Sequence, residues 1–173
     1  ASVRHADVVF IAVGTPPDDQ GDADLSYVVA AAKEVAPAIA SYTVVATKST
    51  VPVGTGRAVA KIINETAPEA NFDIASVPEF LREGSAVADF AKPDRIVVGT
   101  ETERAASVLR DLHGPLLEGR PDRFVSTEIE TAELIKYSAN AFLAVKITFI
   151  NEIADLCERV GGNVEDVAKA MGL

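Results

Sequence analysis

The chain has 173 residues, of which 48% are hydrophobic and 6% aromatic, and it carries a formal net charge of −10. This length fits one α/β domain or one domain plus part of another, and the acidic balance argues against nonspecific binding to nucleic acid or to anionic membranes. No apolar run approaches the ~20 residues that span a bilayer, and the single cysteine, Cys157, excludes an internal disulfide and is typical of the reducing cytoplasm.

Up to residue 126, short runs rich in Val and Ile alternate with Ala-rich helical stretches. Nearly continuous apolar strands separated by helices are typical of a parallel sheet that is covered on both faces. We therefore assign residues 1–126 to the second half of a doubly wound, Rossmann-like α/β sheet. The expected strands are Val8–Val13, Thr43–Thr47, Asp73–Val77, Arg95–Val98 and Arg123–Ser126, and the expected helices are Leu25–Ser41, Gly56–Thr66 and Thr102–Gly114.

A much longer helix is expected after residue 127. Thr127 and Glu130 have the spacing of a capping box, in which the hydroxyl and the carboxylate each bind a free amide at the helix start. No Gly or Pro follows until Gly161, and about 33 residues at 1.5 Å each give a helix of roughly 50 Å. Asn163 then has the position of a cap for a short last helix, Val164–Met171.

Between residues 142 and 160 the long helix is apolar on most of its sides. Such a helix has to be buried on several faces, which a single sheet cannot provide, so a second subunit or another domain should cover it. We assign residues 127–173 to a long central dimerisation helix plus a short helix, at the start of a central domain. Cys157 lies at an apolar end of the long helix, which favours a buried structural thiol over a nucleophile.

Three expected strands end in motifs of small and polar residues: Val13-Gly14-Thr15-Pro16, Lys48-Ser49-Thr50-Val51-Pro52-Val53-Gly54 and Val77-Pro78-Glu79-Phe80-Leu81-Arg82-Glu83-Gly84-Ser85-Ala86. Open α/β sheets place ligands at the carboxyl ends of their strands. Glu79 and Glu83 share one face if the chain turns helical after Pro78. The alternative is a solvated first helical turn, in which acidic residues suit the helix dipole. Gly54-Thr55-Gly56 lacks the third glycine of a phosphate-binding turn and is interpreted as a plain strand–helix turn.

Lys136 and Asn140 are one helical turn apart, so they project from the same side of the long helix. From the residues alone, two alternatives stay open for Lys136: it snorkels to solvent, or its ammonium stabilises a developing oxyanion. Glu133, three residues earlier, is within reach of an ion pair with Lys136. The two histidines and the one cysteine are dispersed, which indicates no metal site.

These motifs, together with Lys92-Pro93-Asp94-Arg95-Ile96-Val97-Val98-Gly99, follow one another in an order that resembles the UDP-glucose/GDP-mannose dehydrogenase family. The resemblance covers nearly the whole chain and implies an NAD-dependent oxidoreductase that converts UDP-glucose to UDP-glucuronate. Two hydride transfers would proceed through a thioester on a cysteine. Neither the family's cysteine loop nor a G-x-G-x-x-G turn occurs in this chain. We therefore expect residues 1–126 to be the C-terminal half of the NAD-binding domain, and the isolated chain to be inactive.

The resemblance also implies roles for individual residues. Glu79 corresponds to an acid/base or water-positioning carboxylate, and Lys136 to the ammonium that stabilises the oxyanion. The amide of Asn140 holds a hydroxyl or a water, and Thr50 positions the catalytic water and contacts the nicotinamide ribose. Val77 stands where the family usually has Asn, which affects the fine geometry of the loop but leaves the role of Glu79.

Further residues are implied in binding the cofactor and the substrate. Small residues at the end of the first strand let a dinucleotide approach the backbone, and Glu83 contacts the nicotinamide side. Arg95 is expected to form a structural ion pair. The implied NAD contacts are Val13, Gly14, Thr15, Thr50 and Glu83, and the implied sugar contacts are Glu79, the backbone of Phe80, Leu81 and Arg82, and the side chains of Lys136 and Asn140.

Two alternatives to a UDP-glucose enzyme stay open. A sibling dehydrogenase would act on GDP-mannose or on a UDP-N-acetylhexosamine, but Ser-Thr-Val-Pro-Val-Gly combined with Lys-Pro-Asp-Arg favours the glucose enzyme. As an isolated polypeptide, the chain would be a noncatalytic dimerisation and binding module. The expected partners are UDP-glucose and a second copy of the chain through the long helix, with no nucleic acid and no membrane.

Overall fold

The computed structural model describes residues 3–172 and contains one five-stranded sheet. It divides into two compact units, one through Lys136 and one from Tyr137 onward. The strands are β1 (Val8–Ile11), β2 (Thr43–Thr47), β3 (Phe72–Ser76), β4 (Ile96–Thr100) and β5 (Phe124–Thr127). The α-helices are α1 (Ser26–Val35), α2 (Thr55–Thr66), α3 (Ala86–Ala91), α4 (Glu103–His113), α5 (Ile129–Val160) and α6 (Val164–Met171), and short 3₁₀ turns cover Val3–His5, Ala36–Ala38, Gly114–Leu117 and Pro121–Arg123.

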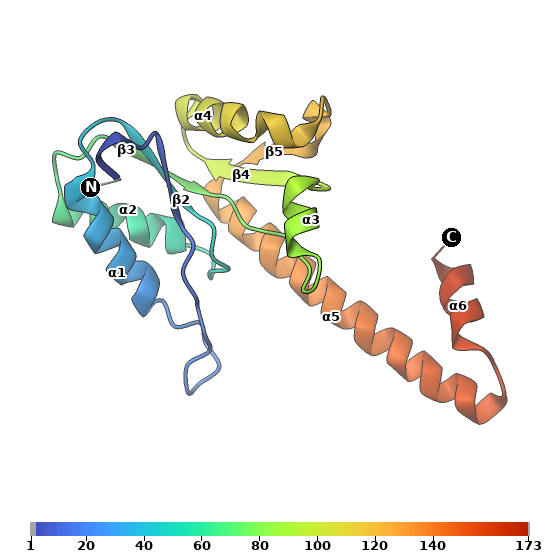
Figure 1. Ribbon diagram of the computed structural model, residues 1–173. Helices are drawn as coiled ribbons and strands as arrows, with labels where there is room; N and C mark the ends of the chain where they lie inside the picture. The colour runs from blue at the N-terminus through green and yellow to red at the C-terminus, as the bar shows by residue number, and fades with distance from the viewer. Residues whose placement is uncertain (1–2, 173) are drawn as a thin grey trace. The chain divides into compact units, whose positions relative to one another are not determined.

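The strands lie side by side in the order β1-β2-β3-β4-β5, so each strand pairs with the one that precedes it in the sequence (Figure 1). The expectation of a wholly parallel sheet is wrong at one place, because β3 and β4 pair antiparallel through Ala75↔Thr100 and Ser76↔Gly99. A parallel connection needs a crossover, usually a helix packed on the sheet. The only helix between these strands is α3, which has no buried residue. The chain therefore re-enters the sheet from the edge at which β3 left it.

The core lies on both faces of the sheet, as expected. Alternate residues of each strand point to opposite faces, so Val45 packs with α1 and α2, whereas Val44 and Ala46 pack with α4. Figure 1 shows α1 and α2 on one side of the strands and α4 on the other. This arrangement leaves the carboxyl ends of the parallel strands β1, β2 and β3 at one edge of the sheet.

All the expected strands and helices are present, most of them with shifted bounds. The structure also contains α3, which was not expected from the sequence. The first expected helix ends early, at Val35, because Pro37 follows and cannot continue the helical hydrogen bonds. The side chain of Thr102 caps α4 by accepting a hydrogen bond from Ala105 N.

The first two turns of α5 pack into the sheet unit. A Cβ added at Gly99 would lie 2.6 Å from Ala132 Cβ and 2.7 Å from Glu128 O, so only glycine permits this close approach. The expected capping box is wrong, since Thr127 Oγ1 donates to the Glu128 carboxylate. Glu130 instead accepts from Arg57 Nε at 2.7 Å.

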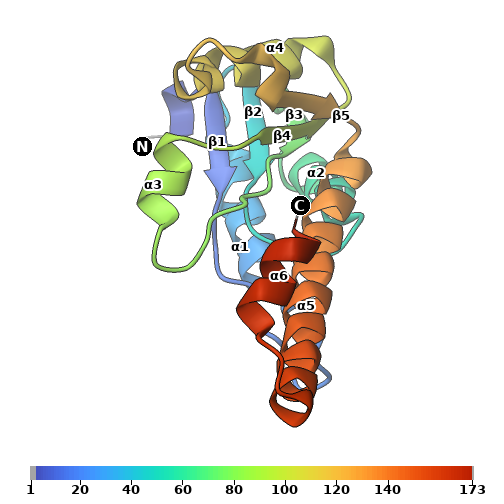
Figure 2. The same cartoon turned by 90° about the vertical axis from the view of Figure 1, so that its right-hand side faces the viewer.

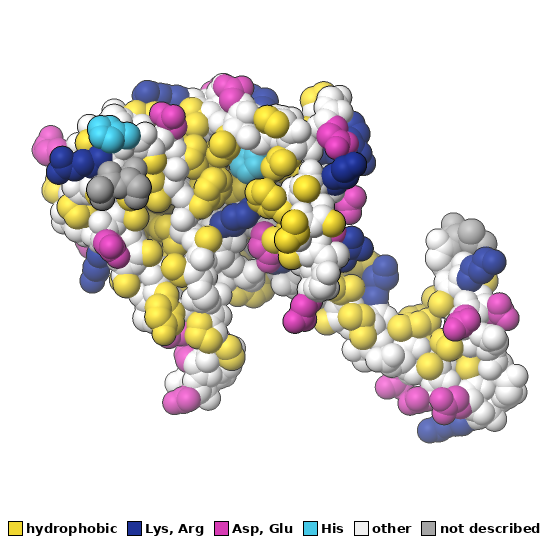
Figure 3. Space-filling model, viewed as in Figure 1, with side chains coloured by type: hydrophobic (Ala, Val, Ile, Leu, Met, Phe, Trp, Pro, Cys, Tyr) yellow, Lys and Arg dark blue, Asp and Glu magenta, His cyan; other side chains and the backbone are white. Residues whose placement is uncertain are grey.

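The second unit consists of the rest of α5 and of α6, which folds back after Gly161 (Figure 2). Asn163 caps α6 as expected, with Oδ1 accepting from Glu165 N and Asp166 N, and Cys157 is buried. Large apolar side chains are exposed along this unit (Figure 3), among them Phe142 at 65% and Phe149 at 47%. No helix between residues 3 and 172 combines the length and the apolar character that a membrane crossing requires.

Candidate active site

The loops after β1 and β2 are joined by side-chain hydrogen bonds. Val13 N donates to Ser49 Oγ at 2.9 Å, and Ser49 Oγ donates in turn to Val13 O at 2.6 Å. Thr15 Oγ1 donates to Thr50 O at 2.9 Å. These contacts hold together two of the motifs that the sequence singled out. A hollow of about 410 Å³ opens beside them, lined by Ala12, Val13, Gly14, Thr15, Lys48, Ser49, Thr50, Glu79 and Leu81.

The loop after β3 carries Glu79 to the same hollow, but the chain does not turn helical after Pro78. It runs without regular structure to Ser85, and Gly84 adopts a φ of 84°, in the left-handed region. The expectation that Glu79 and Glu83 share a helical face is therefore wrong. Glu79 Oε2 accepts from Leu81 N at 2.6 Å, which fixes the carboxylate, whereas Glu83 is exposed.

Lys136 meets Glu79 from the second turn of α5. Its ammonium lies 3.1 Å from Glu79 Oε1, and its side chain is only 8% exposed. The snorkelling alternative is therefore excluded. The ring of Phe80 lies beside two cations, with its centroid 5.4 Å from Lys136 Nζ and 4.2 Å from Arg95 Cζ. Arg95 thus stacks on an aromatic ring, and among residues 3–172 we find no ion pair that it makes.

Lys48 is a second lysine at this site, and sequence reasoning gave it no role. Burial lowers the pKa of its amine, although the negative charge of Glu79 acts in the opposite direction. The amine lies 5.8 Å from the Phe10 ring centroid and 5.9 Å from that of Phe90. Its position directly after the buried strand β2 was the feature of the sequence that could have identified Lys48 as a site residue.

Glu133 was expected within reach of Lys136, but it binds elsewhere. Its two carboxylate oxygens accept from Gly54 N at 2.7 Å and from Gly56 N at 2.8 Å, at the start of α2. The residue is 2% exposed, and this burial raises the pKa of the carboxyl, while the two N–H donors oppose the rise. The N-terminus of α2 is therefore already filled by a carboxylate of the chain itself.

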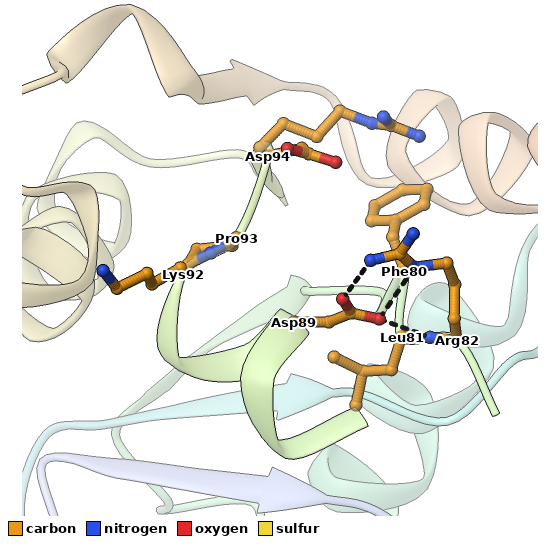
Figure 4. Close-up of a pocket in the computed structure, with 8 residues that line it drawn as sticks. Phe80, Leu81, Arg82, Asp89, Lys92, Pro93 and Asp94 are labelled. Carbon is orange, nitrogen blue, oxygen red and sulfur yellow. Dashed lines mark hydrogen bonds and ion pairs between the residues drawn. The ribbon is translucent and has the colours of Figure 1, made fainter. Parts of the chain in front are cut away.

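A second pocket of about 210 Å³ lies next to the Glu79 loop (Figure 4). Within it, Arg82 donates hydrogen bonds to the Asp89 carboxylate. The guanidinium Nη2 donates to Oδ1 at 2.6 Å, and the backbone N–H donates to Oδ2 at 2.9 Å. These bonds hold the pKa of Asp89 well below its usual range. The N–H groups of Leu81 and Arg82 are thus engaged within the chain. The expected backbone contacts to a sugar would have to use other atoms of this loop.

Asn140 is exposed and belongs to the second unit, one turn after Lys136 on α5. The structure brings together Thr50, Glu79 and Lys136 with the residues after β1, all within the first unit. Among the described residues, no three His, Cys, Asp or Glu side chains are placed to hold a metal ion.

The profile described as "UDP-glucose/GDP-mannose dehydrogenase family, NAD binding domain" matches residues 1–117, and that of the family's central domain matches residues 130–173. The first match confirms a Rossmann-like NAD-binding domain followed by a long helix. It does not support the narrower expectation of a second half only, because the profile is that of the NAD-binding domain itself.

Individual relatives agree with the family profiles. UDP-glucose 6-dehydrogenase of Rhizobium meliloti is 57% identical over 175 residues, which cover 99% of this chain and 40% of that protein. A UDP-glucose dehydrogenase structure from Pyrobaculum islandicum has a TM-score of 0.89 at 47% identity, covering 99% of this chain and 40% of that one. A GDP-mannose dehydrogenase structure from Pseudomonas aeruginosa also has a TM-score of 0.89, at 32% identity, covering 98% and 39%. The chain thus spans about two fifths of the length of these relatives.

Proposed function

Because the chain belongs to the UDP-glucose/GDP-mannose dehydrogenase family, we propose that the full-length protein oxidises UDP-glucose to UDP-glucuronate with NAD. The conversion would remove two hydrides from the sugar, one for each of two NAD, and would consume one water when the thioester is hydrolysed. Cys157, the one cysteine of this chain, is buried in the second unit, so the proposal assigns the thioester to a cysteine outside this chain. The proposal is supported by the relatives named UDP-glucose 6-dehydrogenase, at 57% and 47% identity.

The hollow at the ends of β1 and β2 fits the nicotinamide side of NAD. Gly14 lies on its wall, and among residues 3–172 no atom other than those of Gly14 and its two chain neighbours comes within 4 Å of the place where a Cβ would stand. Packing within the chain therefore does not explain this glycine, whereas a ligand that approaches the backbone does. Val13, Thr15 and Thr50 complete this wall, and Glu83 is proposed to contact the same side. NAD supplies the hydride acceptor when bound.

The pair of Glu79 and Lys136 carries the chemical part of the proposal. An ammonium held beside the reacting carbon stabilises the oxyanion that forms when a thiolate or water adds to a carbonyl. Glu79, fixed by Leu81 N and Lys136 Nζ, orients the attacking water or exchanges its proton. Thr50 holds that water from the neighbouring strand end, and Asn140 holds a substrate hydroxyl. The single observation that carries this proposal is the 3.1 Å contact between a buried lysine and a carboxylate at a strand end.

In the same proposal, residues 1–126 serve the cofactor and residues 127–173 begin the central domain, which pairs two subunits in the cytoplasm. The exposed apolar side chains of α5 support this pairing. A monomer rarely exposes a contiguous apolar patch larger than a few hundred Å², and a twofold arrangement of two such helices would cover it.

The proposal is tested with the full-length protein, NAD and three nucleotide sugars. We expect NADH formation with UDP-glucose, and little with GDP-mannose or a UDP-N-acetylhexosamine. Preference for either of the other sugars would assign the protein to a sibling activity. Steady turnover by the isolated 173-residue chain would contradict the role given to a cysteine outside it.

A further inference from the structure

One turn of α5 makes charged contacts with two different loops of the sheet unit. Glu133 accepts from the backbone of Gly54 and Gly56, at the end of the loop that carries Thr50. Lys136, three residues later, contacts Glu79 at 3.1 Å, in the loop after β3. The two charged side chains of this turn therefore do not neutralise each other but bind outward in two directions.

The contacts of Glu133 are closely defined. Both oxygens are used, the side chain is 2% exposed, and a Cβ at Gly56 would come within 3.3 Å of Oε1 and 2.6 Å of Ile129 Cγ2. A carboxylate at a helix N-terminus is stabilised by the unpaired N–H groups and the helix dipole. A helix cap of α2 alone would need only a short local residue such as Ser or Asp. Here the cap comes from a residue 77 positions away in sequence from Gly56.

Its distance in sequence means that the cap fixes α5 as well as α2. A helix is stiff over one turn, so the position of residue 133 determines that of residue 136. Ile129 and Ala132, which precede Glu133 on α5, are fully buried, whereas Glu130 pairs with the exposed Arg57. Glu133 thus makes a buried polar contact between α5 and the start of α2, within one turn of Lys136.

We propose that Glu133 is a positioning residue for the proposed reaction, which aligns Lys136 with Glu79 and with the Thr50 loop by binding the start of α2. This inference rests on the proposed function for its kinetic test. It goes beyond that function because Glu133 does not line the hollow and binds the start of α2 instead. It also assigns the N-terminus of α2 to a carboxylate of the protein in place of a cofactor phosphate.

The first experiment is a double-mutant cycle in the full-length enzyme with Glu133→Gln and Lys136→Met. A glutamine keeps the shape but presents an NH₂ group to one of the two N–H donors. Since a misplacement of about 1 Å far from the chemistry can cost 10²-fold, we expect Glu133→Gln to lower kcat by about 10–100-fold with little change in KM. In the Lys136→Met background the same change should lower kcat less than about twofold, because the effect acts through Lys136.

The matched control is Glu130→Gln, three residues before Glu133 on α5, whose carboxylate binds only the exposed Arg57; its kcat should equal that of the wild type. An equal loss of kcat from Glu133→Gln in both backgrounds would show a merely structural role and overturn the inference, as would no loss at all. If Glu133→Gln does not fold, Glu133→Asp, which keeps the charge but shortens the reach, replaces it in the cycle.

A second readout does not require activity. Lys136 of the folded full-length protein is treated with an amine-acylating reagent, and its modification is measured by mass spectrometry of its peptide. We expect Lys136 to be protected in the wild type and in Glu130→Gln, and modified in Glu133→Gln. Protection in all three would overturn the inference. Absence of turnover with every nucleotide sugar, combined with a modified Lys136 in Glu133→Gln, would instead contradict the proposed function alone.

Discussion

Removing either partner of the Lys136–Glu79 ion pair should destabilise the protein, but by unequal amounts. Glu79→Gln leaves the Lys136 ammonium, whose side chain is 8% exposed, without a counter-charge. Lys136→Met leaves a carboxylate that is 29% exposed and still accepts from Leu81 N. Water reaches the remaining carboxylate far more readily than the remaining ammonium, so the first change should cost more.

The expected magnitudes follow from this difference in exposure. Breaking a buried ion pair by removing one partner costs about 3–5 kcal/mol, and an exposed pair contributes about 0–1 kcal/mol. Glutamine still offers an oxygen to the lysine, so we expect about 2–3 kcal/mol of lost unfolding free energy for Glu79→Gln. For Lys136→Met, whose methylenes keep their packing, we expect about 1 kcal/mol.

The assay is urea unfolding followed by far-ultraviolet circular dichroism, because the chain has no tryptophan. With a slope of about 2 kcal/mol/M, the two variants should differ in midpoint by roughly 0.5–1 M. Lys61→Met is the matched control, since Lys61 forms an exposed ion pair with Glu65 within α2 and its loss should shift the midpoint very little. Equal midpoints for Glu79→Gln and Lys136→Met, or a lower one for Lys136→Met, would refute the reasoning.

Three further outcomes are expected. Gly99→Ala should cost about 1–3 kcal/mol in urea unfolding, because its new methyl group meets Ala132 and the backbone of α5 below van der Waals distance; unchanged stability would show that α5 yields freely. Burial lowers the pKa of His113, so the folded state binds a proton at His113 less readily than the unfolded chain does. The free energy of unfolding should therefore fall as the pH drops below ~6.5, and His113→Phe should reduce this dependence on pH. Phe149→Glu on the exposed face of α5 should lower the association of the full-length protein in sedimentation experiments, and a wild type that sediments as a monomer would contradict the proposed pairing.

The elements of the fold could be predicted from the sequence because their patterns are local. Apolar runs and capping residues placed all five strands, three crossover helices, α5 and α6 near their observed positions. The direction of β4 could not be predicted in this way, since an apolar run reads the same in either direction. The short helix α3 was missed because six residues are too few to display a helical period.

The convergence of the strand-end motifs was also predictable, because parallel strands bring their carboxyl ends to one edge. The partners of the charged residues were not. Glu133 and Lys136 have the spacing of an intrahelical ion pair, and no local pattern distinguishes that pair from two separate contacts. Only the packing of α5 against Gly99 and Gly56 decides which loops the two side chains reach.

The packing of α5 explains why residues 56 and 99 are glycines, which the sequence motifs around them did not indicate. Gly54-Thr55-Gly56 has the appearance of part of a phosphate-binding turn, and the structure shows why it is not one: its amides are bound by the Glu133 carboxylate, and the absence of a side chain at residue 56 admits Ile129. A glycine-rich strand–helix turn therefore binds an anion here as elsewhere, but the anion belongs to the helix that carries Lys136. The same physical preference that holds cofactor phosphates in other turns is used in this chain to fix a helix beside the candidate active site.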